Sequence, residues 1–181
     1  MPRSAIEVLE KYIAGKDLDQ HEILENIYIE DAKVSFEIKS KSISFPDEII
    51  GNKKIAQVLS AEFNKKYDFA KTYYLSRNFP QIDELTISNQ SWLVVMRDKV
   101  SNHVRVGAGH YDWVFEKLNN SQLKIKKHNI FIGVMLELQV PLEFLNELQN
   151  KLEYPWVEEE QVAQVLSNYD ILREIKEYLQ N

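Results

Sequence analysis

Residues 103–116 read HVRVGAGHYDWVFE, residues 122–133 read QLKIKKHNIFIG, and the triplet NNS at 119–121 lies between them. In both long stretches apolar and polar residues alternate with a period near two, which is typical of strands that bury one face. Because Asn and Ser favour turns, the three pieces predict a long antiparallel hairpin. Gly107 and Gly109 lie in mid-strand and predict a bend or a bulge there.

Further strands are expected upstream of this hairpin. Their predicted ranges are 32–38, 71–79, 84–88 and 91–98. Pro80, Asp83 and Asn89 punctuate the last three of these ranges, as turn residues do. Residues 39–50 contain Pro46 and several serines, and they are expected to form a loop or a hairpin.

Three helices are expected before residue 71. Ser4 and Glu7 form a capping-box pattern at the start of the first helix, and Gly15 predicts its end. A second helix is expected to begin at Asp19 and a third at Gly51. Helices that precede a run of long strands indicate the α+β class, with helices on one face of an antiparallel sheet.

After Pro141 the pattern becomes helical again, over 142–153 and 158–179. The second range carries one apolar stripe made of Val162, Val165, Leu166, Tyr169, Leu172, Ile175 and Leu179. Glutamates 158–160 fit the positive end of the helix dipole, and a docking patch is the alternative interpretation. Residues 141–181 hold 3 basic and 9 acidic side chains, so the whole formal charge of −6 lies there. We expect a domain over 1–140 and an acidic helical extension over 141–181 packed on it.

Composition excludes several classes of protein. The 181 residues include no cysteine, so disulfide frameworks and thiolate nucleophiles are excluded. The acidic balance argues against a nucleic-acid partner. The longest apolar run, Ile130–Leu136, is much shorter than the about 20 residues of a membrane span, and the first residues lack a signal-peptide pattern. We therefore expect a soluble, cytoplasmic protein with no membrane partner.

Four short stretches occur in an order that is typical of one superfamily. They are IYIEDA at 27–32, IGNKKI at 50–55, GHYD at 109–112 and LKIKKH at 123–128. Together they resemble motifs of the nuclear-transport-factor-two-like superfamily, in particular its SnoaL-like branch. The resemblance implies a cone-shaped curved antiparallel sheet that wraps around three N-terminal helices and encloses an apolar pocket. It also implies a homodimer, because many members pair through the outer face of the sheet.

Asp31 and His110 are the first candidates for a site in that pocket. Asp31 could act as a general base, because aromatic walls such as Tyr28 and Phe36 would raise its pKa. The alternative is a carboxylate that ends the second helix. His110 could move protons near neutral pH, but alternation leaves open which strand face it occupies, and a surface histidine is the alternative.

Tyr73 and Arg77 form the third candidate group. They share one face of the strand predicted over 71–79, and Tyr73 or Tyr74 stands where members of the superfamily often carry a histidine. An arginine next to a tyrosine would suit a carboxylate or an enolate ligand. Cross-strand packing of aromatic side chains is the alternative.

Neither a metal nor a cofactor is expected. The four histidines, His21, His103, His110 and His128, lack the spacing that places two imidazoles on one metal ion. The sequence also has no phosphate-binding loop and no dinucleotide fingerprint. We expect His128 to lie on a solvated strand face beside Lys124, Lys126 and Lys127.

Three hypotheses for function remain open. The first is cofactor-independent proton transfer of the isomerase, dehydratase or cyclase type on a small apolar or carboxylate-bearing ligand. In it, Asp31 or His110 acts as the base, and Tyr28, Tyr73 or Arg77 polarises an oxygen of the ligand. The second is a non-catalytic ligand-binding or protein-interaction module. The third is a small subunit of a complex like the ring-hydroxylating dioxygenases.

Overall fold

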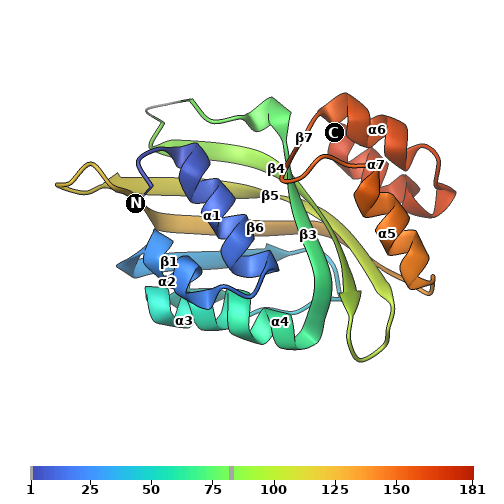
Figure 1. Cartoon of the computed structure of the whole chain (residues 1–181), viewed down its shortest axis with the longest axis horizontal. Helices are drawn as coiled ribbons and strands as arrows, with labels where there is room; N and C mark the ends of the chain where they lie inside the picture. Colours follow the sequence, from blue (N-terminus) through green and yellow to red (C-terminus); the bar gives the residue numbers. More distant parts are fainter. Residues whose placement is uncertain (1, 82–83) are drawn as a thin grey trace.

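One curved sheet organises the chain. The computed structural model describes residues 2–81 and 84–181, and in that part seven strands pair in the order β2-β1-β6-β5-β4-β3-β7 (Figure 1). The strands are β1 (Tyr28–Ile38), β2 (Glu48–Ile50), β3 (Tyr67–Leu75), β4 (Thr86–Asp98), β5 (Val104–Lys117), β6 (Leu123–Leu138) and β7 (Trp156–Val157). Neighbouring strands are antiparallel except for the pairs β1–β6 and β3–β7, which are parallel.

The predicted hairpin is confirmed as β5 and β6, which pair along almost their whole length. Their register shifts between Ala108 and Gly109, so the bulge expected from the glycines is also confirmed. A Cβ on Gly109 would lie 1.9 Å from the carbonyl oxygen of Phe131, which leaves no room for a side chain. This close approach of two backbones helps the sheet to curve.

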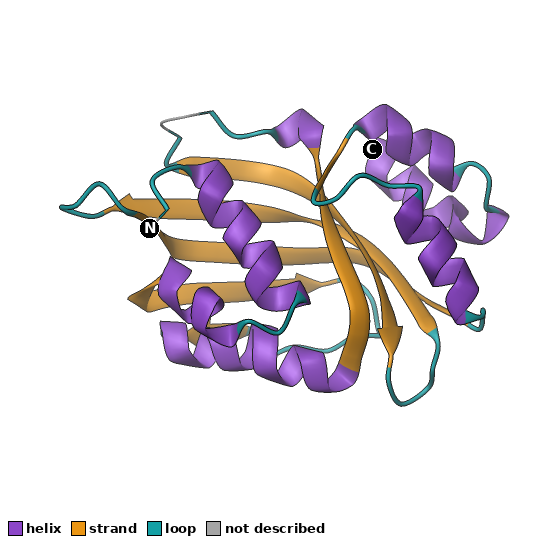
Figure 2. Ribbon diagram, in the orientation of Figure 1, coloured by secondary structure: helices purple, strands orange, loops and turns teal. Residues whose placement is uncertain are grey.

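The inner face of the sheet is covered by the N-terminal helices (Figure 2). These are α1 (Ala5–Asp17), α2 (His21–Ile27), α3 (Asn52–Ala56) and α4 (Phe63–Lys66), with a π-helical segment, Gln57–Glu62, between α3 and α4. Ser4 caps α1 as predicted, because its side chain accepts a hydrogen bond from the Glu7 amide. The predicted end of this helix at Gly15 is wrong, since α1 continues through Asp17.

The outer face carries a second core under the C-terminal helices. These are α5 (Leu142–Asn150), α6 (Glu159–Leu166) and α7 (Arg173–Gln180), and they pack on buried side chains such as Leu93, Val95 and Val106. The continuous helix predicted over 158–179 is wrong, because a 3-10 turn at Asp170–Leu172 separates α6 from α7. The apolar stripe still faces the sheet, since Val162, Leu166, Leu172, Ile175 and Leu179 are all buried.

Other strand boundaries differ from the prediction. The range 91–98 and residues 86–88 of the range 84–88 belong to one strand, β4, which resumes its pairing with β5 after a register shift near Asn89, where φ is 55°. β3 begins at Tyr67 and ends at Leu75, so Arg77 lies in a 3-10 turn after the strand. Residues 39–50 form a loop followed by the short strand β2.

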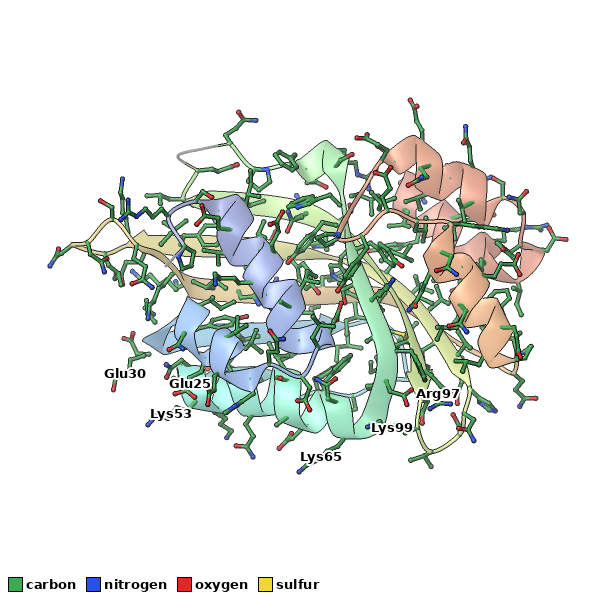
Figure 3. The ribbon with its side chains drawn as sticks, in the orientation of Figure 1. Glu25, Glu30, Lys53, Lys65, Arg97 and Lys99 are labelled. Atoms are coloured by element: carbon green, nitrogen blue, oxygen red, sulfur yellow. The ribbon has the colours of Figure 1, made fainter. Side chains whose placement is uncertain are left out.

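Exposed charges lie at the rim of this α+β cone. Lys53 and Lys65 point away from the sheet near α3 and α4, and Lys99, in the turn between β4 and β5, donates to the Asn64 carbonyl of α4 at 2.6 Å (Figure 3). Within the described residues, no helix is long and apolar enough to cross a membrane.

Candidate functional site

A small cavity lies inside the cone, between α1, the π-helical segment and the inner face of the sheet. Its volume is about 40 Å³. Because one ordered water needs roughly 10–15 Å³ of such volume, the cavity has room for a few waters and not for a larger molecule. The apolar part of its wall includes Phe36, Phe45, Phe63, Met96 and Met135.

A charged pair from α1 lies against this cavity. Lys16 lines the cavity, and its ammonium group is 3.0 Å from Asp17 Oδ1 and 2.8 Å from Thr72 Oγ1. The residues Lys16 and Asp17 are 8% and 7% exposed, so the pair is buried. The Lys16 ammonium also lies 4.3 Å from the centre of the Phe63 ring, a cation–π contact.

Asp17 is saturated with hydrogen-bond donors. Besides Lys16, its carboxylate accepts from the Thr72 amide at 2.6 Å and from the Thr72 hydroxyl at 3.0 Å. The Tyr154 hydroxyl, from the loop that follows α5, donates to Asp17 Oδ2 at 2.9 Å. A buried charge needs this kind of pairing and hydrogen bonding, because transfer of an unpaired charge from water is costly.

Two side chains, one from the π-helical segment and one from α4, explain why α1 continues to this point. Ser60 Oγ donates to the Gly15 carbonyl at 2.9 Å, and Asn64 Nδ2 donates to the Lys16 carbonyl at 2.8 Å. Carbonyl groups at the end of a helix lack partners within the helix, so these side chains satisfy them. The two hydrogen bonds fix the direction of Lys16 at the cavity.

Two further residues that line the cavity, Tyr12 and Trp92, carry buried polar atoms. Trp92 Nε1 is buried and makes no hydrogen bond within residues 2–81 and 84–181, whereas Tyr12 Oη is buried with the Tyr111 hydroxyl as its neighbour but without a well-formed hydrogen bond. Leaving a buried donor unpaired costs about 1–3 kcal/mol. An indole N–H can only donate, and a hydroxyl can donate as well. A guest in this cavity would therefore gain most by supplying an acceptor.

His128 lies deeper in the cone and is 1% exposed, so the prediction of a solvated position is wrong. Its ring stacks on Trp113 with 3.7 Å between the ring centres, and Nδ1 is 2.8 Å from the Tyr28 hydroxyl. Burial lowers the pKa of His128 well below its ordinary value of 6.5. The imidazole is thus neutral at neutral pH.

This shift predicts a pH dependence of stability. As the pH falls below about 6.5, the unfolded chain takes up a proton at His128 before the folded chain does, so stability decreases. The expected slope is up to about 1.4 kcal/mol per pH unit, until the pH reaches the pKa of the folded state. Urea unfolding at about pH 7 and pH 5 should therefore show a smaller acid loss for His128→Gln than for the natural chain. Equal losses in the two proteins would contradict this account.

The structure separates the two residues considered as bases. Asp31 is exposed in an irregular part of β1, where the register with β6 shifts between Tyr28 and Lys33. His110 is half-buried on the outer face of β5, where its ring stacks on Phe131 with 4.5 Å between ring centres. Neither residue lines the cavity inside the cone.

The other four candidates lie in four different places. Phe36 lines the cavity, and Tyr28 is buried beside His128. Tyr73 points to the outer face, where it contacts the ring of Tyr154. Arg77 lines a separate open groove of about 710 Å³ between the turn after β3 and helices α6 and α7. There its guanidinium contacts Glu159 at 2.6 Å and the Ser91 hydroxyl at 2.7 Å.

Sequence reasoning missed Lys16, Asp17 and Thr72. One signal was present, because Lys16 follows Tyr12 by four positions and so continues the apolar face of α1. A lysine on the buried side of a helix is unusual and indicates a partner. No comparable signal in the sequence identifies Thr72.

Solved structures with this architecture are known. A hexachlorocyclohexane dehydrochlorinase, LinA type 2, aligns with a TM-score of 0.60 and 17% identity over 76% of this chain and 89% of that chain. A candidate scytalone dehydratase from Novosphingobium aromaticivorans aligns with a TM-score of 0.58 and 16% identity over 76% and 87%. A nuclear transport factor 2-like protein from Salmonella enterica serovar Typhimurium aligns with a TM-score of 0.55 and 11% identity over 68% and 84%. No protein-family model and no curated protein matches the chain.

The chain therefore has the cone fold of the nuclear-transport-factor-two-like superfamily, and the predicted resemblance is confirmed at the level of the fold. One scaffold of this kind carries many functions, so function has to be argued from the residues of the cavity.

Proposed function

We propose that this protein binds a small, mainly apolar molecule inside the cone and holds a carboxylate or carbonyl oxygen of that molecule. The observation that carries the proposal is the set of groups on the cavity wall. Lys16, Tyr12 and Trp92 line the cavity and carry hydrogen-bond donors, and the Trp92 indole has no partner within the described residues. The rest of the wall is largely apolar, as expected for a ligand whose only polar end is an oxygen.

The ligand needs more space than the present cavity of about 40 Å³. Two kinds of wall residue can provide it. Phe45 lies in the loop between β1 and β2 and stacks on Phe36 with 4.7 Å between ring centres. A displacement of this loop would therefore move the Phe45 ring out of the cavity wall. Met96 and Met135 also line the cavity, and methionine side chains adapt easily to a change in shape. We propose entry past Phe45.

Binding is favoured over proton transfer by the state of Asp17. Both of its carboxylate oxygens already accept hydrogen bonds, so it is a poor candidate for a general base. The donors on the wall would polarise a bound oxygen, which is one requirement of isomerase and dehydratase chemistry. A base positioned against the ligand is the other requirement.

A cavity-opening variant tests the proposal. Phe45→Ala should bind benzoate, which carries a carboxylate on a flat apolar ring, with an affinity measurable by calorimetry. Adding Tyr12→Phe should weaken benzoate binding at least fivefold, because one donor to the carboxylate is lost. The same substitution should lower the free energy of unfolding by no more than about 0.5 kcal/mol, since the Tyr12 hydroxyl loses only its imperfect contact with the Tyr111 hydroxyl.

Tyr74→Phe is the matched control for that experiment. The Tyr74 hydroxyl is also buried, but it donates to the Leu9 carbonyl at 2.9 Å. Its loss should cost about 1 kcal/mol of stability and leave benzoate affinity unchanged. If benzoate does not bind to Phe45→Ala, or binds equally well after Tyr12→Phe, the proposed function is wrong.

A further inference from the structure

We propose that the C-terminal extension is part of this ligand site, and that Tyr154 is a positioning residue that sets how strongly Lys16 binds the ligand's oxygen. The inference rests on the proposed function and adds to it a role for a segment outside the cone. The contact that carries it is the hydrogen bond from the Tyr154 hydroxyl to Asp17 Oδ2, 2.9 Å long, across 137 positions of the chain.

The segment that follows α5 is held firmly against the cone. β7 pairs in parallel with the end of β3, and the Tyr74 amide donates to the Pro155 carbonyl at 2.7 Å. Trp156 packs on Tyr74 with 4.8 Å between ring centres, and its indole donates to Glu10 Oε1 at 3.1 Å. These contacts on either side of the Tyr154–Pro155 bond place the Tyr154 ring over the end of α1.

Tyr154 can influence Lys16 through the carboxylate of Asp17, which contacts both residues. Asp17 Oδ1 accepts from the Lys16 ammonium, and Oδ2 accepts from the Tyr154 hydroxyl. Burial and the nearby charge of Asp17 raise the pKa of Tyr154, so its hydroxyl stays protonated and donates to the carboxylate. A donor on Oδ2 withdraws negative charge from the carboxylate. Asp17 then neutralises Lys16 less completely, and the ammonium remains available to an acceptor in the cavity.

Other charged and titratable groups around Tyr154 do not replace this contact. The Lys71 ammonium lies over the Tyr154 ring, 5.3 Å from its centre, and Tyr73 meets the ring edge to face at 5.5 Å. Both contacts involve the ring and would persist in a phenylalanine. Tyr154→Phe therefore removes the donor to Asp17 and keeps the packing.

The test compares two probes of the same shape in the Phe45→Ala background. Benzoate carries a charged carboxylate, and nitrobenzene is its neutral isostere. Tyr154→Phe should weaken benzoate binding about fivefold while nitrobenzene affinity changes less than twofold. Tyr169→Phe is the matched control, because this tyrosine also belongs to the extension but its hydroxyl bonds to Glu147 and Lys151 at the surface. That control should leave the ratio of the two affinities unchanged.

A second measurement tests the role of Tyr154 without any ligand. The side-chain ammonium resonance of Lys16 in nuclear magnetic resonance spectra should shift in Tyr154→Phe and stay in place in Tyr169→Phe. If Tyr154→Phe weakens both probes equally or neither probe, or leaves the Lys16 resonance unmoved, the inference is overturned. The proposed function survives that result as long as Tyr12→Phe still weakens benzoate. If benzoate does not bind at all, both proposals fail together.

Discussion

Removal of residues 141–181 is expected to abolish the folding of the remaining chain. The deletion would expose the outer core on β3, β4 and β5, where Leu75, Leu93, Val95, Val104 and Val106 are all 0% exposed. Full burial of one such side chain contributes about 1.5–3 kcal/mol. Five of them together approach or exceed the about 5–15 kcal/mol of net stability that a typical domain has.

Size-exclusion chromatography and circular dichroism check this expectation. The truncated chain should elute as aggregate or lose the cooperative unfolding transition of the full chain. A truncated chain that also carries Leu93→Thr, Val95→Thr and Val106→Thr is the control, because it presents a more polar outer face and should be recovered in larger soluble yield. Truncation without any change in association or in unfolding temperature would show that the helices are dispensable to the cone.

Asp17→Ala is expected to lower the free energy of unfolding by about 3–5 kcal/mol. The substitution leaves the Lys16 ammonium buried without its counter-charge, and it removes the acceptor of the Tyr154 hydroxyl and of the Thr72 amide. Most of the expected loss in the free energy of unfolding comes from leaving Lys16 charged and unpaired in the interior. The lost attraction between the two charges contributes the smaller part.

Asp68→Ala is the matched control in urea unfolding at pH 7. Asp68 forms an ion pair with Arg97 at 2.6 Å, but both side chains are more than a quarter exposed, and Arg97 lies at the rim of the molecule (Figure 3). Water can solvate either group when its partner is lost, so we expect a change of about 1 kcal/mol or less. If Asp17→Ala is no more destabilising than Asp68→Ala, the buried pair does not have the structural role assigned to it.

The order of elements could be predicted because each rests on a local pattern. The two-residue period of β5 and β6 and the cap at Ser4 are properties of neighbouring residues, and both predictions hold. The end of α1 could not be predicted in this way. Gly15 would stop an isolated helix, but Ser60 and Asn64 come from a distant segment and satisfy the carbonyls that let the helix continue.

The face on which His110 lies could not be predicted for a related reason. In most antiparallel sheets one face is exposed to solvent, so the alternation of apolar and polar residues shows which face is buried. In β5 both faces are buried along much of the strand, because Tyr111 and Trp113 pack inside and Val106 and Ala108 pack under the extension. The alternation separates two cores and does not say which of them encloses a cavity.

The two ends of the sheet have a consequence for behaviour in concentrated solution. One edge strand, β2, has 3 residues and the other, β7, has 2 residues. An exposed long edge offers unpaired amides and carbonyls to the strands of other molecules and so promotes fibrillar aggregation. Here the two long outer strands, β1 and β3, are each partly covered by a short neighbour, and β3 is further interrupted near Phe69, where φ is 52°. The sheet is thus a poor template for the growth of a fibril, even though it belongs to a chain rich in long strands.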